Sequence, residues 1–103
     1  MASGTLGQSA PAAATNTTVY TVPAAKVAST IVSIMNRGPN SAAVRLAVAA
    51  TGTPTTSEWL EYDTPLEAGG VLERTGIVAS AGKNFVVYAS TATVSVSIYG
   101  YED

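Results

Sequence analysis

The sequence predicts a small all-β domain, a β-sandwich of Greek-key or jelly-roll type with seven or eight short strands. Stretches rich in Val, Ile, Thr and Tyr recur along the 103 residues, and several alternate between apolar and polar side chains. Turn sequences rich in Gly, Pro and Asn separate these stretches at the spacing typical of sandwich folds. No stretch has the periodicity of an amphipathic helix. A small barrel would give the same pattern and is the alternative.

The first eighteen residues predict an extended N-terminal arm. The segment MASGTLGQSAPAAATNTT has no charged side chain and, after the first Met, a single bulky apolar residue, Leu6. Such a segment has too little apolar surface to build a core. We therefore expect residues 1–18 to form an arm and residues 19–103 to form the sandwich.

Three strands are expected in the first half of the sandwich region. Residues 19–22 are β-prone and stop at Pro23, because proline has no N–H for a sheet ladder. Residues 24–28 could add one helical turn. Residues 29–35 are rich in β-branched side chains. Val44, Leu46 and Val48 alternate with Arg45 and Ala47, as in a half-buried strand.

The second half predicts further strands in the same way. Residues 58–62 have a strand composition, and Pro65 is expected to close the connection that follows them. Residues 71–78 form another extended stretch with a break expected at Gly76. Residues 84–89 are apolar and follow a Gly-Lys turn signal, so they complete the expected strands before the last one.

The last expected strand is the most regular and places two tyrosines on its outer side. Val94, Val96 and Ile98 alternate with polar residues, which gives a period of two. Tyr99 and Tyr101 fall on the opposite side and should point away from the core. They are candidates for a subunit interface or a sugar platform, because tyrosine offers a large contact area at low entropic cost. Capping of the sandwich end, or shelter beneath the arm, is the alternative.

The composition argues against several classes of function. The chain has no Cys and no His, which removes thiol chemistry and the side chain best suited to proton transfer near neutral pH. Its five basic residues are scattered and the net charge is −2, so no basic patch for nucleic acid is expected. No apolar run reaches the roughly 18 residues that cross a membrane. We expect no enzyme activity, no cofactor, and neither nucleic acid nor a membrane as partner.

An acidic cluster is the remaining candidate for chemistry, and it consists of Glu58, Glu61, Asp63 and Glu67. If Glu61 and Asp63 share a strand face they lie about 7 Å apart, a separation that could suit glycosidase carboxylates or a weak calcium site. Nothing in the sequence marks either one for a raised pKa, and the ordered pattern of a calcium loop is missing. A charged strand edge that discourages sheet association explains the same residues, so no catalytic or metal-binding residue is expected.

Several short motifs occur in a suggestive order over nearly the whole chain. They are LGQ at 6–8 with Ala10-Pro11, YTVP at 20–23, NRG at 36–38, YAS at 88–90 and VSVSIYG at 94–100. This order resembles small virion structural proteins of tailed bacteriophages, including those that infect cyanobacteria. The resemblance implies a capsid decoration or cement protein on the outer capsid surface of the virion, commonly a homotrimer, with the major capsid protein as partner. It also implies an alternative, a distal tail-fibre or tailspike module that binds a host glycan or receptor.

Two sets of contact residues follow from these expectations. The arm should lie along a neighbouring subunit or the capsid, held by main-chain hydrogen bonds as in strand addition, and it should order only there because ordering costs entropy. A disordered tail is the alternative. Trp59 is more often a core anchor than a ligand platform. The candidate arm contacts are Leu6, Gln8, Pro11 and Asn16, and the candidate interface or glycan platform consists of Trp59, Tyr62, Tyr99 and Tyr101.

Overall fold

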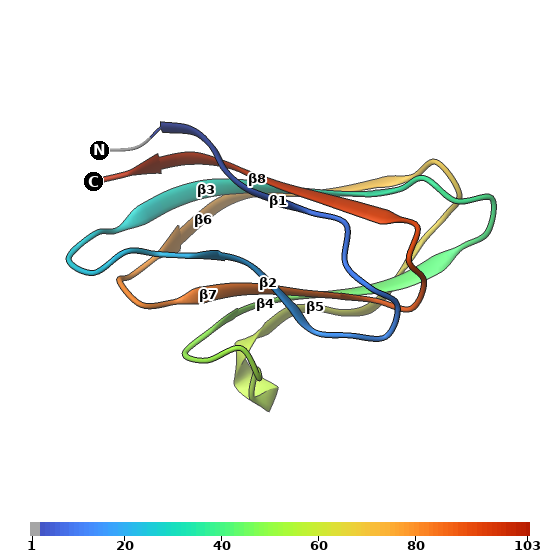
Figure 1. Cartoon of the computed structure of the whole chain (residues 1–103), viewed down its shortest axis with the longest axis horizontal. Coiled ribbons are helices and arrows are strands. Elements are labelled where there is room, and N and C mark those ends of the chain that lie inside the picture. Colours follow the sequence, from blue (N-terminus) through green and yellow to red (C-terminus); the bar gives the residue numbers. More distant parts are fainter. Residues whose placement is uncertain (1–2) are drawn as a thin grey trace.

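Two four-stranded antiparallel sheets pack face to face in the computed structural model, which describes residues 3–103 (Figure 1). The first sheet has the strand order β1-β8-β3-β6 and the second has the order β2-β7-β4-β5. A short 3-10 helix, η1 (Thr56–Glu58), precedes β5. The strands are β1 (Ser3–Ser9), β2 (Thr17–Thr21), β3 (Ala28–Asn36), β4 (Ala42–Ala49), β5 (Trp59–Leu66), β6 (Val71–Ala79), β7 (Asn84–Ala89) and β8 (Val94–Glu102).

The strand pairing is that of a jelly roll. β1 pairs with β8, β2 with β7, β3 with β6 and β4 with β5, so the second half of the chain runs back along the first half. The pairs β3–β8 and β4–β7 join these ribbons into the two sheets. Eight strands in two sheets with this order define the jelly roll, so the predicted sandwich is confirmed in its jelly-roll form.

The core lies between the sheets and is formed by the inward positions of the alternating strands. In β3, and in β8 from Val94 to Ile98, every second side chain is buried, as the period of two predicts. The central strands of the second sheet face them with side chains that include Phe85, the largest of the fully buried ones. Burial of this apolar surface is the main driving force for folding. The fully buried residues include Val32, Ile34, Val44, Leu46, Phe85, Val87, Val94, Val96 and Ile98.

The structure corrects the arm expected at residues 1–18. Residues 3–9 form β1, which pairs with β8 from Ser3 opposite Tyr101 to Ser9 opposite Val96. The physical basis of the prediction holds, since a segment of small uncharged residues does add as a strand to a free sheet edge. That edge belongs to β8 of the same chain. Residues 10–16 connect β1 to β2, and the first two residues lie outside the described part of the chain.

Several other boundaries differ from those expected. β5 continues through Pro65 to Leu66, which an edge strand permits because one side of its backbone is not needed by the sheet. β6 runs without interruption, and the break expected at Gly76 is a bulge where this residue has a φ of 70°. The helical turn expected at residues 24–28 is a tight turn, in which the N–H of Lys26 donates to the carbonyl of Pro23 at 3.2 Å.

Asn36, at the end of β3, fixes the loops at one end of the sandwich. Its buried Nδ2 donates to the carbonyls of Asn40 at 2.7 Å and Leu66 at 3.0 Å. Its Oδ1 accepts from the N–H of Gly38 at 3.0 Å and the hydroxyl of Thr93 at 2.9 Å. These four bonds use the full capacity of an asparagine side chain. The loops after β3, β5 and β7 are therefore held together by one residue.

Candidate functional site

The four predicted platform aromatics lie on opposite outer faces of the molecule. Trp59 and Tyr62 belong to β5 in the second sheet, whereas Tyr99 and Tyr101 belong to β8 in the first sheet. Tyr99 is 39% exposed and Tyr101 is 49% exposed, so both point away from the core as predicted. The four residues therefore form two separate surfaces.

The first surface is the outer face of the first sheet. Tyr99 lies opposite Ile31 of the neighbouring β3, and Met35 lies opposite Val71 at the other end of β3. Residues directly opposite each other in an antiparallel pair share a face of the sheet. In the described parts of these four strands, Glu73 is the one charged side chain on this face. The outer apolar face, as we name it, consists of Ile31, Met35, Val71, Val78, Tyr99 and Tyr101.

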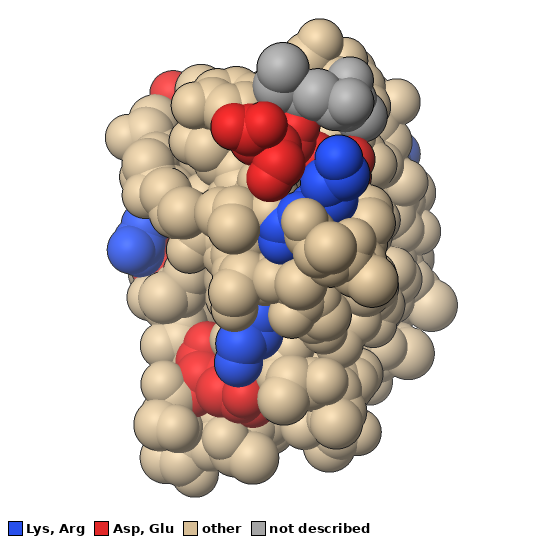
Figure 2. All heavy atoms as spheres, turned by 90° about the vertical axis from the view of Figure 1, so that its left-hand side faces the viewer, with Lys and Arg blue, Asp and Glu red and all other residues tan. Residues whose placement is uncertain are grey.

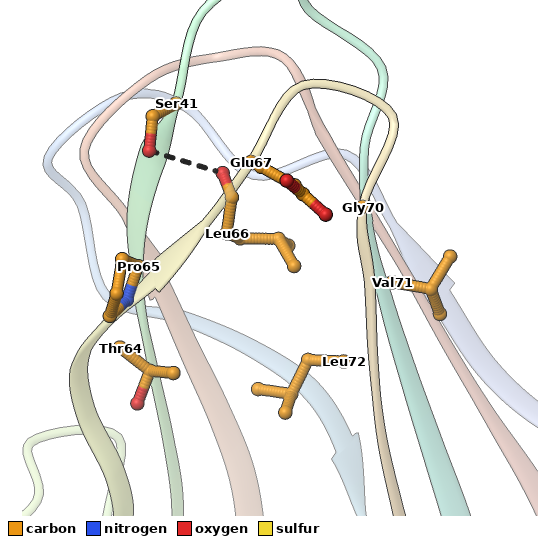
Figure 3. A pocket seen from close by; sticks show the side chains of 8 residues that line it. All are labelled: Ser41, Thr64, Pro65, Leu66, Glu67, Gly70, Val71 and Leu72. Carbon is orange, nitrogen blue, oxygen red and sulfur yellow. Dashed lines mark hydrogen bonds between the residues drawn. The ribbon is translucent and has the colours of Figure 1, made fainter.

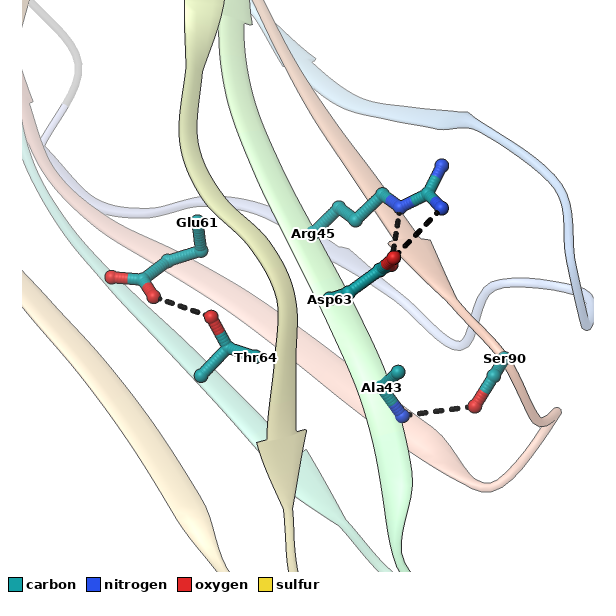
Figure 4. Close-up of polar contacts among 6 residues, drawn as sticks. All are labelled: Ala43, Arg45, Glu61, Asp63, Thr64 and Ser90. Carbon is teal, nitrogen blue, oxygen red and sulfur yellow. Dashed lines mark hydrogen bonds and ion pairs between the residues drawn. The ribbon is translucent and has the colours of Figure 1, made fainter.

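The second surface is built around Arg45 in β4. Its guanidinium carbon lies 4.1 Å from the ring centre of Tyr62 and 4.2 Å from that of Tyr88. Its Nε donates to Oδ1 of Asp63 at 2.6 Å, and a terminal nitrogen donates to Oδ2 at 3.2 Å (Figure 4). These bonds lower the pKa of Asp63 and raise that of Arg45. A cation between two rings and a carboxylate holds Tyr62 in place.

Trp59 lies beside this stack and has two roles. It packs on a small apolar cluster of Ala47, Ala49 and Val86, which is separate from the main core. It also meets Tyr62 edge to face, with ring centres 5.3 Å apart. Together with Thr56 the two aromatic side chains line a hollow of about 240 Å³. This volume is below the roughly 300–1,000 Å³ of pockets that enclose drug-sized ligands. The hollow therefore suits a single small ring.

The predicted acidic cluster is dispersed. Glu61 accepts a hydrogen bond from the hydroxyl of Thr64 at 2.7 Å (Figure 4) and another from Arg74 of β6. These contacts, the Thr64 bond first, lower the pKa of Glu61. Asp63 points to Arg45 instead. A general acid needs a raised pKa, so neither carboxylate is prepared for that role. Within residues 3–103 no three acidic side chains come together as metal ligands.

Glu58 and Glu67, the other two acidic residues, lie apart from this pair. The Glu58 carboxylate accepts hydrogen bonds from the backbone N–H of Thr55 at 2.8 Å and of Ala50 at 3.0 Å. These two bonds lower its pKa and close the loop before η1. Glu67 lies at the rim of the groove between β5 and β6. The four acidic residues of the predicted cluster therefore lie in separate environments.

A larger groove opens where the two sheets part, between the edge strands β5 and β6 (Figure 3). It has a volume of about 430 Å³, and its lining includes the apolar side chains of Leu66 and Leu72. The hydroxyl of Ser41, which also lines the groove, donates to the carbonyl of Leu66 at 3.5 Å. Val71 lines it too and also belongs to the outer apolar face. The groove therefore shares one residue, Val71, with that face.

The four predicted arm contacts are used differently from one another. Leu6 packs against the core, and Pro11 is buried. Gln8 donates from Nε2 to the hydroxyl of Ser97 on β8 at 3.2 Å. Asn16 is exposed in the connection before β2. Three of the four therefore contact the sandwich of their own chain.

Charge is sparse and mixed in sign. Figure 2 shows the end of the molecule where the described chain ends meet, and there the basic side chains lie beside acidic ones. No helix in the described residues is long and apolar enough to cross a membrane. No protein-family model matches the sequence, and no curated protein is significantly similar to it.

Proposed function

We propose that this protein acts by adhesion, as a capsid decoration or cement protein that docks on the outer surface of a phage head. The outer apolar face carries this proposal. Its side chains are 39–66% exposed, and Glu73 is the one carboxylate among them. Several exposed apolar side chains on one face of a sheet, with a single charge among them, favour a role in protein interaction. Its burial against a neighbour contributes about 25 cal/mol per Å².

Two further observations support the same class of function. Jelly rolls occur in viral capsids and in lectins, an analogy at the level of the fold that favours binding over catalysis. The resemblance of the motif order to small virion structural proteins of tailed bacteriophages implies the phage capsid as the assembly and the major capsid protein as the partner. In this proposal copies act together as a homotrimer, because several weak contacts made at once give high avidity.

The test is co-sedimentation with phage capsids that lack this protein. The double variant Ile31→Ser/Tyr99→Ser should weaken binding about tenfold or more, because two apolar side chains at the centre of the face are lost. The matched control is Tyr62→Ser on the opposite sheet, which should bind as the wild type does. Unchanged binding by the double variant, with its fold intact by circular dichroism, would overturn the proposal.

A second candidate function is the binding of a host glycan by a tail-fibre or tailspike module, which the hollow at Trp59 and Tyr62 favours. A sugar ring can place its apolar face on an aromatic ring while its hydroxyls bond to a nearby group such as Thr56. On a glycan array, Tyr62→Ala should remove binding while Tyr99→Ala leaves it unchanged. The reverse result would move the glycan site to the first sheet, and silence across a broad array would reject it.

A further inference from the structure

β1 is held in the first sheet mainly by its backbone. It lies at the sheet edge and pairs with β8 alone. Leu6 is its one large apolar side chain and is only partly buried against the core. The register shifts between Thr5 and Gly7, which interrupts the ladder. Main-chain hydrogen bonds to β8 are therefore the principal attachment, and the same strand of another copy can make them equally well.

The connection from β1 to β2, when fully extended, is longer than the shortest dimension of the domain. Residues 10–16, fully extended, span about 24 Å. The shortest dimension of the domain is 20 Å. The connection also contains Ala14 with a φ of 54°, a left-handed conformation that is unfavourable for a residue with a Cβ. An extended connection would release this strain.

The position that β1 occupies accepts few other sequences. A Cβ at Gly7 would lie 2.5 Å from the carbonyl oxygen of Val19 and 3.2 Å from Cβ of Tyr20, so the strand in this position needs glycine there. An empty position would leave the outer backbone of β8 unpaired from Val96 to Tyr101. The occupant with matching length, register and glycine is β1 itself, from the same chain or from another.

We propose that copies of this protein exchange β1, so that β1 of one chain pairs with β8 of a second copy. The exchanged state keeps the contacts between β1 and β8 and changes the connection at residues 10–16. If two chains exchange β1 with each other, the product is a dimer. If each chain passes β1 to the next one around a ring, the product is a larger closed oligomer. The inference goes beyond the proposed function, since it concerns the isolated protein and involves no capsid.

Engineered disulfides test this directly, because the chain contains no cysteine. Thr5 lies opposite Tyr99 across β1 and β8, within the distance that a disulfide bridges. The single variants Thr5→Cys and Tyr99→Cys are mixed, unfolded and refolded together, oxidised, and separated on a non-reducing gel. Exchange should give disulfide-linked heterodimers well above the level in the control mixture. Without exchange, the two cysteines lie in separate domains and are not held opposite each other.

The matched control replaces Tyr99→Cys by Ser95→Cys, which lies on the same face of β8 beyond the last residue paired with β1. A second opposed pair, Gln8→Cys mixed with Ser97→Cys, repeats the measurement if a variant at Thr5 or Tyr99 fails to refold. Heterodimer yields equal to the control, in protein with native circular dichroism, would overturn the exchange. The readout uses purified protein alone, so loss of capsid binding would not affect it.

Discussion

Individual buried polar side chains link the two sheets to each other. Asn36 makes four side-chain hydrogen bonds, and the hydroxyl of Tyr20 in β2 donates to the carboxylate of Glu102 in β8. In the described residues every buried side-chain nitrogen and oxygen has a partner. A buried polar group without one costs about 1–3 kcal/mol. Each of these contacts therefore makes one arrangement of its neighbours much more favourable than others.

Asn36→Asp should destabilise the fold by about 2–4 kcal/mol, because it removes both donors and places a charge against two carbonyl oxygens. Urea denaturation measures the loss. The control is Asn40→Asp, whose side chain is exposed and whose free energy of unfolding should change by less than about 0.5 kcal/mol. Equal stability of the two variants would contradict the role given to Asn36.

The raised pKa of Tyr20 predicts that the folded protein loses stability in alkali. Burial, and then the contact with Glu102, raise its pKa above the ordinary 10.0. The folded protein therefore keeps this proton more tightly than the unfolded chain does. The resulting stability is fully present below pH 10 and is lost as the pH rises above it. Urea midpoints at pH 9 and pH 11 should show a smaller decrease for Tyr20→Phe than for the wild type. Tyr101→Phe, which removes an exposed hydroxyl, should keep the full decrease.

Among the strands, β1 shows where a local pattern fails to predict an element. β7 is rich in β-branched and aromatic residues, β3 contains a run of β-branched residues from Thr30 to Val32, and both strands lie close to the predicted positions. β1 has the sequence SGTLGQS, which contains two glycines and one β-branched residue, Thr5, and so has low strand propensity. It is a strand because the edge of β8 supplies partners for its backbone. This pairing partner lies about ninety residues away along the chain, so the local sequence of β1 does not reveal it.

Gly7→Ala tests how closely β1 crosses β2. The added Cβ would meet the carbonyl of Val19 at 2.5 Å, so β1 must shift and the fold should lose about 1–3 kcal/mol. Hydrogen exchange of the β8 amides should become faster at the same time. Ser3→Ala, at an exposed position of the same strand, should change stability by less than about 0.5 kcal/mol. A Gly7→Ala variant as stable as the wild type would show that the crossing is looser than described.

At the scale of the whole molecule, the two outer faces differ in chemistry although the inner faces are alike. The period of two predicted which residues point inward, and the core agrees with it. It could not predict that β5 and β8 lie in different sheets, because alternation says nothing about which strands are neighbours. The strand order of the two sheets must therefore be known before Trp59 and Tyr62 can be placed on a different face from Tyr99 and Tyr101. The same holds for the ion pair between Arg74 of β6 and Glu61 of β5, which links the two sheets at their open edge.

The distribution of carboxylates predicts a gradual loss of stability in acid. Contacts lower the pKa values of Glu58, Glu61 and Asp63 from ordinary values of 4.5 for Glu and 3.8 for Asp. The folded form thus releases these protons more readily than the unfolded form. This stability is present above the ordinary values and is lost as the pH falls through the lowered ones. Melting temperatures at pH 6 and pH 3 should differ less for Glu61→Gln than for the wild type, while Glu73→Gln should match the wild type.

The neighbouring positions of Ser3 and Tyr101 have a practical consequence for rearranging the chain. Both ends of the described chain leave the domain at the same pole (Figure 1), opposite the loops fastened by Asn36. A short peptide could join these ends, and new ends could be opened at the exposed residues 51–53. Such a circular permutant would turn the pole that now carries both ends into a closed loop, leaving the order of strands in space unaltered.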